Sequence, residues 1–396
     1  MWFLWSILKK SELSAPSALP EQAADGGSGR QILSLRSIAG AEDLIDPLRQ
    51  SITGNPAPVL LVGEEGSGKH YAARRLAAAL LCDEPDERDG ACGQCASCRL
   101  LAGGAHYDLI EIEPTADKKT IAVAAVREQV TGTLSLFPQL SRRRVYIISA
   151  VKAATLNEQG QNALLKPLEE HPDFVRFIIL TEDAERLLPT IRSRSRVIHM
   201  GRRSDENIRE ILEQSGETDR QAMDLAIRYA DGLPGQALAI VGDMAFRELR
   251  ARVFDYFVRL PRESRTFAFT EGMKLLQDNS SASSGTKLQK HERMRITEVL
   301  RLLESFLRDL LLLKQSIPRG RLVNTDFAEQ LESMLAAYPL ADPLHAALLV
   351  QQTSRALSAN AIFEHTVARL MGGLRHYLSG QPVSPHIYLH ENAGIR

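Results

Sequence analysis

The sequence lacks a net charge of either sign and any long apolar run. Its 396 residues include 48 Lys and Arg against 49 Asp and Glu, a net charge of −1. This balance excludes a globally basic nucleic-acid binder and an acidic disordered chain. No run approaches the about 20 apolar residues that a membrane-spanning helix needs. We therefore expect a cytoplasmic globular protein with no membrane partner, long enough for two to four domains at roughly 100–200 residues each.

The first residues carry no secretory pattern. Met1–Leu8 is apolar and contains both tryptophans, but Lys9 and Lys10 follow it, whereas a signal peptide has its positive charge before the apolar stretch. We interpret this stretch as a docking or packing segment, with a loosely ordered leader or a misplaced start as the alternative. Residues 11–30 are rich in Ser, Ala, Pro and Gly and are predicted to be a linker, because they offer little apolar surface to bury.

The sequence has only four cysteines, and they lie close together in the chain. The four cysteines, Cys82, Cys92, Cys95 and Cys98, have the spacing C-x9-C-x2-C-x2-C. Two overlapping C-x2-C turns and one more distant cysteine can place four thiolates around one tetrahedral zinc ion. Two disulfides are the alternative, but they persist mainly in oxidising compartments. The spacing favours structural zinc, and four thiolates would leave no open position for catalysis.

A glycine-rich turn follows a short apolar run and precedes a helical pattern, which is the context of a phosphate-binding loop. Gly63, Gly66, Gly68 and Lys69 supply its glycines and its lysine. The hydroxyl that should hold Mg²⁺ is replaced by His70, and Mg²⁺ prefers oxygen ligands. We expect the magnesium site to be lost and ATP binding to be doubtful. The alternative is a plain strand-to-helix turn.

The acidic residues of a working ATPase are also missing. An apolar strand followed by Asp-Glu should supply them, but the strand predicted at Arg144–Ser149 ends in Ser149, and Ala150 follows. Because three groups needed for hydrolysis are absent together, we expect no intrinsic enzymatic activity.

Strand patterns alternate with helical patterns up to Met200, which predicts an α/β fold with a parallel sheet. Beyond Met200 the pattern is helical throughout, and Ser204 is placed to cap the first helix. The strands are expected at Pro58–Val62, Tyr107–Glu113, Arg144–Ser149, Phe174–Thr181 and Ser195–Met200; the first helices at Tyr71–Leu81, Thr120–Leu134, Thr155–Glu170 and Ala184–Arg192; and the later ones at Phe246–Val258, Phe267–Leu276, Glu292–Leu313, Phe327–Tyr338, Pro343–Ser358 and Ile362–Tyr377.

Several of these segments resemble the clamp-loader subunits of bacterial DNA polymerase III. The cysteine quartet follows a phosphate-loop helix, as in that family. Residues 161–170 (QNALLKPLEE) resemble its NALLK-x-LEE helix, and residues 187–195 (LLPTIRSRS) resemble its LLPTIRSRC segment. The resemblance covers about residues 40–245 and implies an AAA+ P-loop fold with a zinc-module insertion, a small helical lid and an all-α C-terminal collar.

Within the family, the degenerate nucleotide site resembles the delta-prime type of subunit, which is inactive as an ATPase but keeps an arginine finger. The resemblance implies that Arg194 acts on the nucleotide of a neighbouring subunit, although Ser195 replaces the family's cysteine. Thr181 matches the position that senses the terminal phosphate, with a ligand-free strand-end hydroxyl as the alternative. The loop around Gln236 resembles the lid's sensor region but offers no cation.

The resemblance also implies the partners: gamma/tau-like ATPase subunits, a delta-like subunit, and the sliding clamp and primed DNA reached through the complex. A gamma/tau-like ATPase and a zinc-ribbon nucleic-acid-binding module are the alternatives. The domains are expected at residues 1–35 (N-terminal segment and linker), 36–201 (AAA+ domain, zinc module 82–98), 202–245 (lid), 246–380 (C-terminal oligomerisation domain) and 381–396 (tail).

Overall fold

The computed structural model describes residues 34–380, apart from 36–37, 39–41, 55, 87–89, 115–119, 151–155, 277–289 and 360. The stretches Met1–Leu8 and Ser280–Gly285 and the tail from Gln381, singled out in the sequence, lie outside the described residues. The chain divides into two compact units, residues 1–241 and 242–396.

The first unit contains a five-stranded sheet in the order β2-β3-β4-β1-β5, in which each pair is parallel. The predicted parallel α/β sheet is therefore confirmed. The inner strands β1 and β3 are buried along their whole length, as expected when helices cover both faces. The strands are β1 (Val59–Val62), β2 (Leu109–Ile112), β3 (Arg144–Ser149), β4 (Val175–Thr181) and β5 (Arg196–His199).

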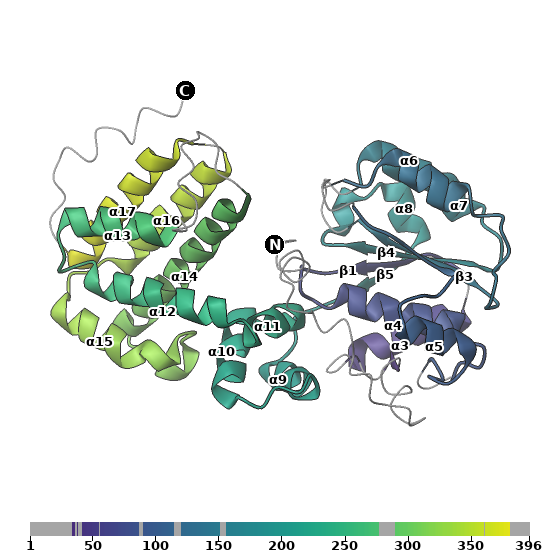
Figure 1. The fold of residues 1–396 in the computed structure, drawn as a ribbon, viewed down its shortest axis with the longest axis horizontal. Helices are drawn as coiled ribbons and strands as arrows, with labels where there is room; N and C mark the ends of the chain where they lie inside the picture. Colours follow the sequence, from purple (N-terminus) through teal and green to yellow (C-terminus); the bar gives the residue numbers. More distant parts are fainter. Residues whose placement is uncertain are drawn as a thin grey trace. The chain divides into compact units, whose positions relative to one another are not determined.

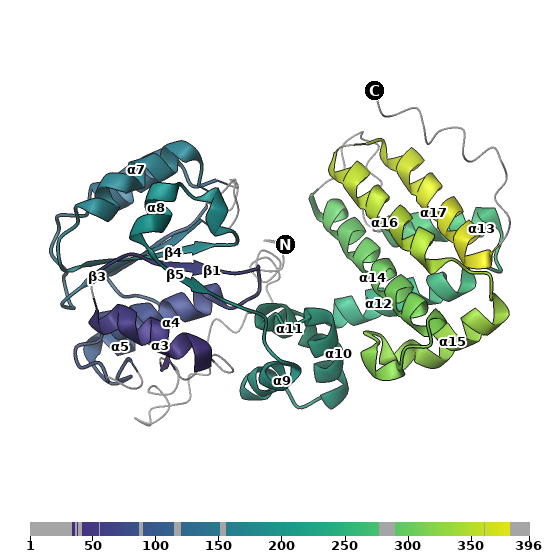
Figure 2. The ribbon, with the colours of Figure 1, turned by 180° about the vertical axis from the view of Figure 1, so that it is seen from behind.

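Helices pack on both faces of this sheet (Figures 1 and 2). One face is covered by α3, α4 and α5 and the other by α6, α7 and α8. Each face has its own apolar cluster, because alternate residues of every strand point to opposite sides. The helices are α3 (Glu42–Thr53), α4 (Lys69–Leu81), α5 (Ala96–Ala102), α6 (Val123–Val126), the π-helix η2 (Arg127–Thr131), α7 (Glu158–Glu169), the 3-10 turn η3 (Ala184–Arg186) and α8 (Pro189–Arg194).

Two predicted helices differ from the structure. The helix expected at Thr120–Leu134 is the short α6 continued by the π-helix η2. Its end is fixed by β3, since the Thr133 hydroxyl lies 2.8 Å from the Tyr146 hydroxyl and the Arg144 guanidinium donates to the Thr133 carbonyl. The helix expected at Ala184–Arg192 is divided by Pro189, which begins α8 because a first-turn position needs no N–H donor.

Three short helices complete the first unit, and we call them the lid after the expectation for residues 202–245: α9 (Asp205–Gln214), α10 (Arg220–Ala230) and α11 (Pro234–Val241). The Ser204 hydroxyl caps α9 by accepting from the Asn207 amide, as predicted. Gly232 has a φ of 83° in the turn before α11, a conformation that glycine adopts without strain.

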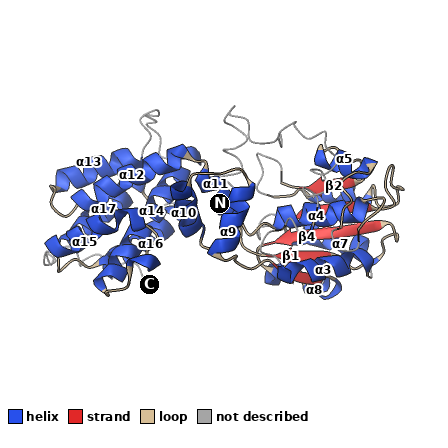
Figure 3. Cartoon of the chain, turned by 90° about the horizontal axis from the view of Figure 1, so that it is seen from below, coloured by secondary structure: helices blue, strands red, loops and turns tan. Residues whose placement is uncertain are grey.

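Every described element of the second unit is helical (Figure 3). The long α14 packs against α12, α15 and α16, and α17 packs against α13 and α16. None of the helices among the described residues combines the length and the hydrophobicity needed to cross a membrane. The helices are α12 (Met244–Arg259), α13 (Arg265–Leu276), α14 (Lys290–Lys314), α15 (Ala328–Ala337), α16 (Pro343–Ser358) and α17 (Phe363–Ser379).

Candidate functional site

The four cysteines form one cluster at the end of α4. Cys82 caps the C-terminus of α4, Cys95 caps the N-terminus of α5, and Cys98 lies inside α5. The four Sγ atoms all lie within 4.8 Å of one another, and the Cys82–Cys95 and Cys92–Cys98 sulfurs are both 3.9 Å apart. Sulfurs bonded to one tetrahedral zinc ion at about 2.3 Å would be about 3.8 Å apart, whereas a disulfide needs about 2.05 Å. The arrangement fits a metal site and not two disulfides.

Backbone amides support this cluster. The Cys92 amide donates to Cys82 Sγ, the Cys95 amide to Cys92 Sγ and the Cys98 amide to Cys95 Sγ, at 3.3–3.4 Å. Hydrogen bonds to the charged form favour it. Hydrogen bonds from the Cys98 thiol and the Cys92 amide lower the pKa of Cys82 to about 5, against the opposing effect of burial. The same hydrogen bond and burial raise the pKa of Cys98, and burial raises the pKa of Cys95, so the backbone and the neighbouring thiol favour the thiolate at Cys82.

The glycine-rich turn keeps the backbone of a phosphate-binding loop. Gly66 and Gly68 have φ values of 87° and 91°, and the Gly63 amide donates to the Thr181 carbonyl at 3.1 Å, which ties the turn to β4. Lys69 is only 3% exposed. Its ammonium donates to the carbonyls of Gly63 and Glu64, the latter at 2.8 Å. Burial lowers the pKa of Lys69 to about 8, with nearby glutamates opposing the shift.

The lid closes directly on this loop, a contact that sequence reasoning did not find. The Gly235 amide, at the start of α11, donates to the Gly66 carbonyl at 2.8 Å. The two backbones are so close that a Cβ atom on Gly235 would lie 3.0 Å from Gly66 Cα. Arg202 adds a second link, with a forked hydrogen bond to the Glu64 carboxylate and another to Asp231. Glycines in a phosphate-binding loop leave room for a phosphate beside the backbone. Here the backbone of the lid packs against Gly66 instead.

The residues that should handle magnesium and water are chemically unsuited to it. His70 is half-exposed, and partial burial followed by the charges of Lys69 and Arg74 lowers the pKa of its imidazole, so the ring is neutral at pH 7. Ser149 ends β3 with its hydroxyl buried and without a hydrogen-bond partner, and Ala150 follows, also buried. No carboxylate is available at either position.

Thr181 ends β4 beside the loop and is 3% exposed. Its hydroxyl donates to the Asp183 carbonyl at 3.0 Å and accepts from the Asp183 amide at 3.2 Å. Both of these bonds lie within its own turn. The structure therefore brings together the predicted loop residues and Thr181, with the hydroxyl of Thr181 engaged locally.

Arg194 lies apart from the loop residues, on the last turn of α8. The sequence placed it just after a helix ending at Arg192, but α8 continues to Arg194 itself. Its side chain is 45% exposed, pairs with Glu169 of α7 at 3.0 Å and donates to the Thr190 carbonyl at 3.3 Å. Pro167 lies inside α7 two residues before its end, so α7 continues past the proline and carries Glu169 to this contact. An exposed ion pair of this kind contributes about 0–1 kcal/mol, so the guanidinium can exchange Glu169 for another anion.

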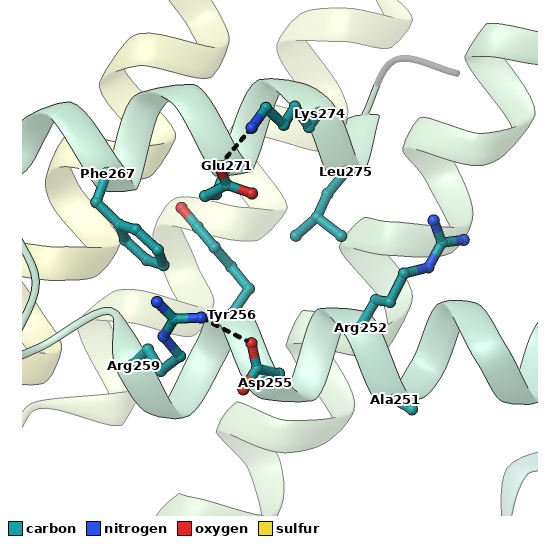
Figure 4. A pocket seen from close by; sticks show the side chains of 9 residues that line it. All are labelled: Ala251, Arg252, Asp255, Tyr256, Arg259, Phe267, Glu271, Lys274 and Leu275. Carbon is teal, nitrogen blue, oxygen red and sulfur yellow. Dashed lines mark hydrogen bonds and ion pairs between the residues drawn. The ribbon is translucent and has the colours of Figure 1, made fainter. Parts of the chain in front are cut away.

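A pocket between α12 and α13 of the second unit does not add to this site (Figure 4). Four of its five charged side chains form two ion pairs, Arg259 with Asp255 at 3.2 Å and Lys274 with Glu271 at 2.7 Å, and Arg252 is the fifth. The Tyr256 hydroxyl donates to the Ala268 carbonyl at 2.8 Å. The side chains lining it contain no pairing of a nucleophile with a base.

Comparison with known proteins agrees with the sequence resemblance. Residues 41–204 match the family described as "DNA polymerase III, delta subunit". The delta' subunit of Escherichia coli is 34% identical over 182 residues, which cover 46% of this chain and 53% of that protein. The delta' subunit of Pseudomonas aeruginosa is 42% identical over 135 residues, covering 34% and 40%. The tau subunit of E. coli is 35% identical over 192 residues, covering 46% and 28%.

The chain thus spans about half the length, or less, of these relatives. Among solved structures, a gamma subunit-related protein of Thermotoga maritima has a TM-score of 0.45 at 17% identity, over 84% of this chain and 99% of that one. The sequence matches are to delta', gamma and tau subunits alike, and the family match at residues 41–204 includes the phosphate loop and the cysteine cluster. Over residues 41–204, this chain is thus similar to the clamp-loader subunits of DNA polymerase III.

Proposed function

We propose that this chain is a delta-prime-like, ATPase-inactive subunit of a cytoplasmic DNA polymerase III clamp loader. In this role it is a scaffold and a donor of an arginine finger to a neighbouring ATPase subunit. The observation that carries the proposal is a contrast between the loop backbone and the residues around it: the backbone and Lys69 are kept, while His70 after the loop and Ser149 and Ala150 at the end of β3 stand where hydrolysis needs a hydroxyl and two carboxylates.

The loop contacts support inactivity. A phosphate-binding lysine has to direct its ammonium at the nucleotide, yet Lys69 donates to Gly63 and Glu64 of its own loop. The lid backbone lies against Gly66. A nucleotide would have to displace both contacts and would still find no magnesium ligand, so we propose that Gly63, Gly66, Gly68, Lys69 and Thr181 now have a structural role.

Arg194 is the residue we propose to act in trans. Guanidinium groups carry their charge at every physiological pH and can donate two parallel hydrogen bonds to phosphate oxygens. Arg194 is exposed at the end of α8, and its pair with Glu169 is weak enough to exchange. Arginine fingers contribute about 10³–10⁵ in rate in well-studied nucleotidases.

We propose structural zinc for Cys82, Cys92, Cys95 and Cys98. When bound, the ion would cross-link the end of α4 to α5 and to the turn between them. The four thiolates would fill the tetrahedron, so the site would stabilise the fold without binding a substrate.

For assembly we propose the second unit. On α16, Leu344 and Leu348 are 49% and 46% exposed, one helical turn apart, and Ile362 and Leu340 are more exposed still. Aliphatic side chains in this arrangement are suited to helix-to-helix contact with other subunits. Leu344→Glu with Leu348→Glu should weaken co-purification with ATPase partners and leave the isolated chain folded, because neither side chain is buried. Full-strength assembly of this double variant would argue against the surface.

A gamma/tau-like ATPase is the second candidate, because gamma and tau subunits match 46% of this chain at 33–35% identity. ATP turnover separates the two. The isolated chain should hydrolyse no ATP above background and should join a hetero-oligomer with an active ATPase. Turnover that Lys69→Ala abolishes would favour the second candidate, and absence of any ATPase partner would remove the first.

A further inference from the structure

Four arginines gather at the edge of the sheet opposite the phosphate loop. Arg142 and Arg143 immediately precede β3, Arg176 is the second residue of β4, and Arg196 begins β5. Parallel strands share one amino edge and one carboxyl edge, and the loop lies at the carboxyl end of β1. We call these four residues the amino-edge cluster.

Contacts show that the cluster is compact. Arg143 donates to the Ile52 carbonyl at 3.4 Å and Arg196 donates to Gln50 Oε1 at 3.2 Å, so both reach the last turn of α3. Arg143 and Arg176 are close enough to repel: burial first, and then the charge of Arg143, lowers the pKa of Arg176. Burial likewise lowers the pKa of Arg143.

The cluster is not neutralised. Of the arginines on the rest of this unit, Arg74, Arg192 and Arg194 each pair with a glutamate. Among the described residues, no carboxylate lies within ion-pairing distance of the four cluster arginines. The carboxylate whose charge raises the pKa of Arg176 is that of the exposed Asp173. The Arg176 guanidinium itself donates to the backbone carbonyls of Asp173 and Val175. Its buried Nε atom has no partner.

Capping of α3 explains only part of the cluster. A cation near the last turn of a helix interacts favourably with its carbonyls, and Arg143 and Arg196 satisfy that need. Arg142 is exposed and Arg176 contacts its own strand, so neither serves α3. Arg143 and Arg176 lie at the start of neighbouring strands and have no carboxylate partner among the described residues, so an anion bound between them would be favoured.

An exposed aromatic ring lies on the same edge. Phe137 is 77% exposed, and the centroid of its ring lies 5.1 Å from that of Phe174. Phe174 precedes Arg176 by two residues in the chain. The backbone of the loop that carries Phe137 is fixed by hydrogen bonds to a buried carboxylate. The buried Asp108 carboxylate accepts from the amides of Gln139, Leu140 and Ser141 at 2.7–2.9 Å.

Arg144 completes the support of this loop. Its guanidinium, 3.8 Å from Asp108, donates to the carbonyls of Thr133 and Phe137. Burial alone would raise the pKa of Asp108, but the three amide hydrogen bonds outweigh it and lower the pKa. The loop therefore presents Phe137 on a fixed backbone, which reduces the ordering cost of binding.

We propose that the amino-edge cluster and Phe137 form a binding surface for single-stranded nucleic acid, separate from the phosphate loop. Unpaired guanidiniums would bind backbone phosphates, and the exposed ring would stack on a base, a combination typical of single-strand sites. The choice of nucleic acid among polyanions rests on the proposed replication function. The exposed Leu136 and Leu140 beside Phe137 would instead serve a protein partner, which the experiment distinguishes.

The test measures binding of the isolated full chain to fluorescent oligo(dT), to an abasic strand of equal length and to a duplex, over a range of salt. The wild type should bind oligo(dT) most tightly. Arg143→Gln with Arg176→Gln should reduce the slope of log K against log salt by about 1.4, at about 0.7 per phosphate contact. Arg142→Gln, at an exposed position, should reduce it by about 0.7 without risk to folding. Phe137→Ala should weaken oligo(dT) binding about 5-fold or more and leave abasic binding unchanged.

The matched control is Arg220→Gln with Arg262→Gln, which removes two exposed arginines elsewhere and should leave the slope unchanged. No oligo(dT) binding at low salt, or equal losses in the control, would overturn the surface. So would a Phe137→Ala variant that loses a protein partner and keeps DNA affinity. None of these results bears on ATP turnover, so the proposed function stands or falls separately.

Discussion

The two ends of helix α4 carry two candidate sites that differ in how complete their ligand sets are. At its N-terminus, the phosphate loop keeps a nucleotide-binding backbone but has His70 where the metal ligand belongs. At its C-terminus, Cys82 and three further cysteines offer a complete set of four metal ligands within 4.8 Å. A closed structural site depends on all its ligands to hold the fold, whereas an open catalytic site can lose its chemistry while the backbone stays useful.

The backbone and the lysine of the loop are engaged in hydrogen bonds within the protein. Gly66 receives the lid's Gly235 amide, and Lys69 is satisfied by the carbonyls of Gly63 and Glu64. One end of α4 thus carries four clustered thiols, and the other carries a loop whose backbone and lysine are hydrogen-bonded within the protein.

The largest expected effect comes from breaking the cysteine cluster. Cys98→Ser should abolish tight zinc binding and unfold the segment around residues 82–98, because structural zinc is worth roughly 10–16 kcal/mol of apparent binding free energy in small modules. Elemental analysis should find one zinc per wild-type chain and none in the variant, and limited proteolysis should cut the variant in this segment. Ser97→Ala, beside it, is the control that keeps all four thiols. Wild-type protein purified without chelator that holds no metal would contradict the prediction.

A smaller effect is expected where the loop meets the lid. Gly66→Ala and Gly68→Ala impose similar backbone strain, since both φ values are near 90°. A Cβ on Gly66 would also lie 3.0 Å from Gln236 Cγ, whereas a Cβ on Gly68 meets nothing within 4 Å. Gly66→Ala should therefore lower the free energy of unfolding by about 1–3 kcal/mol more than Gly68→Ala. Equal losses in urea denaturation would show that the lid does not pack on the loop.

The smallest effect concerns His70. Its pKa is lowered to about 4 from an ordinary 6.5, so folding favours the neutral ring. The stability that this contributes is complete above pH 6.5 and is lost as the pH falls toward 4. His70→Gln should show a shallower loss of unfolding free energy between pH 7 and 4.5 than the wild type, and the difference should be modest because the ring is half-exposed. Identical pH profiles would contradict the lowered pKa.

Sequence patterns predicted elements whose signals are local. Strand Arg144–Ser149 and helix Pro343–Ser358 have the predicted bounds, the first because it is a short apolar run after three arginines, the second because Asp342 caps it and Pro343 suits its first turn. The cysteine cluster was also predictable, because metal-ligand spacing is written in consecutive residues.

Features that depend on distant contacts were not predictable. The π-helix before Thr133 depends on Tyr146 and Arg144 from β3. Helix α3, which contains Pro47, was not among the predicted helices. The Gly235–Gly66 contact joins positions 169 residues apart in the chain, and a glycine at either one indicates only a turn.

The proposal that Arg194 acts in trans while the loop is inert is tested most directly by one measurement: DNA-stimulated ATP turnover by the assembled complex. Complexes should be prepared with the wild-type chain, with Arg194→Ala and with Lys69→Ala, after equal assembly and zinc content are verified. Arg194→Ala should lower the turnover rate, Arg194→Lys should restore it only in part because an ammonium lacks the guanidinium fork, and Lys69→Ala should leave it unchanged. Wild-type turnover with Arg194→Ala, or a loss of turnover with Lys69→Ala, would contradict the account.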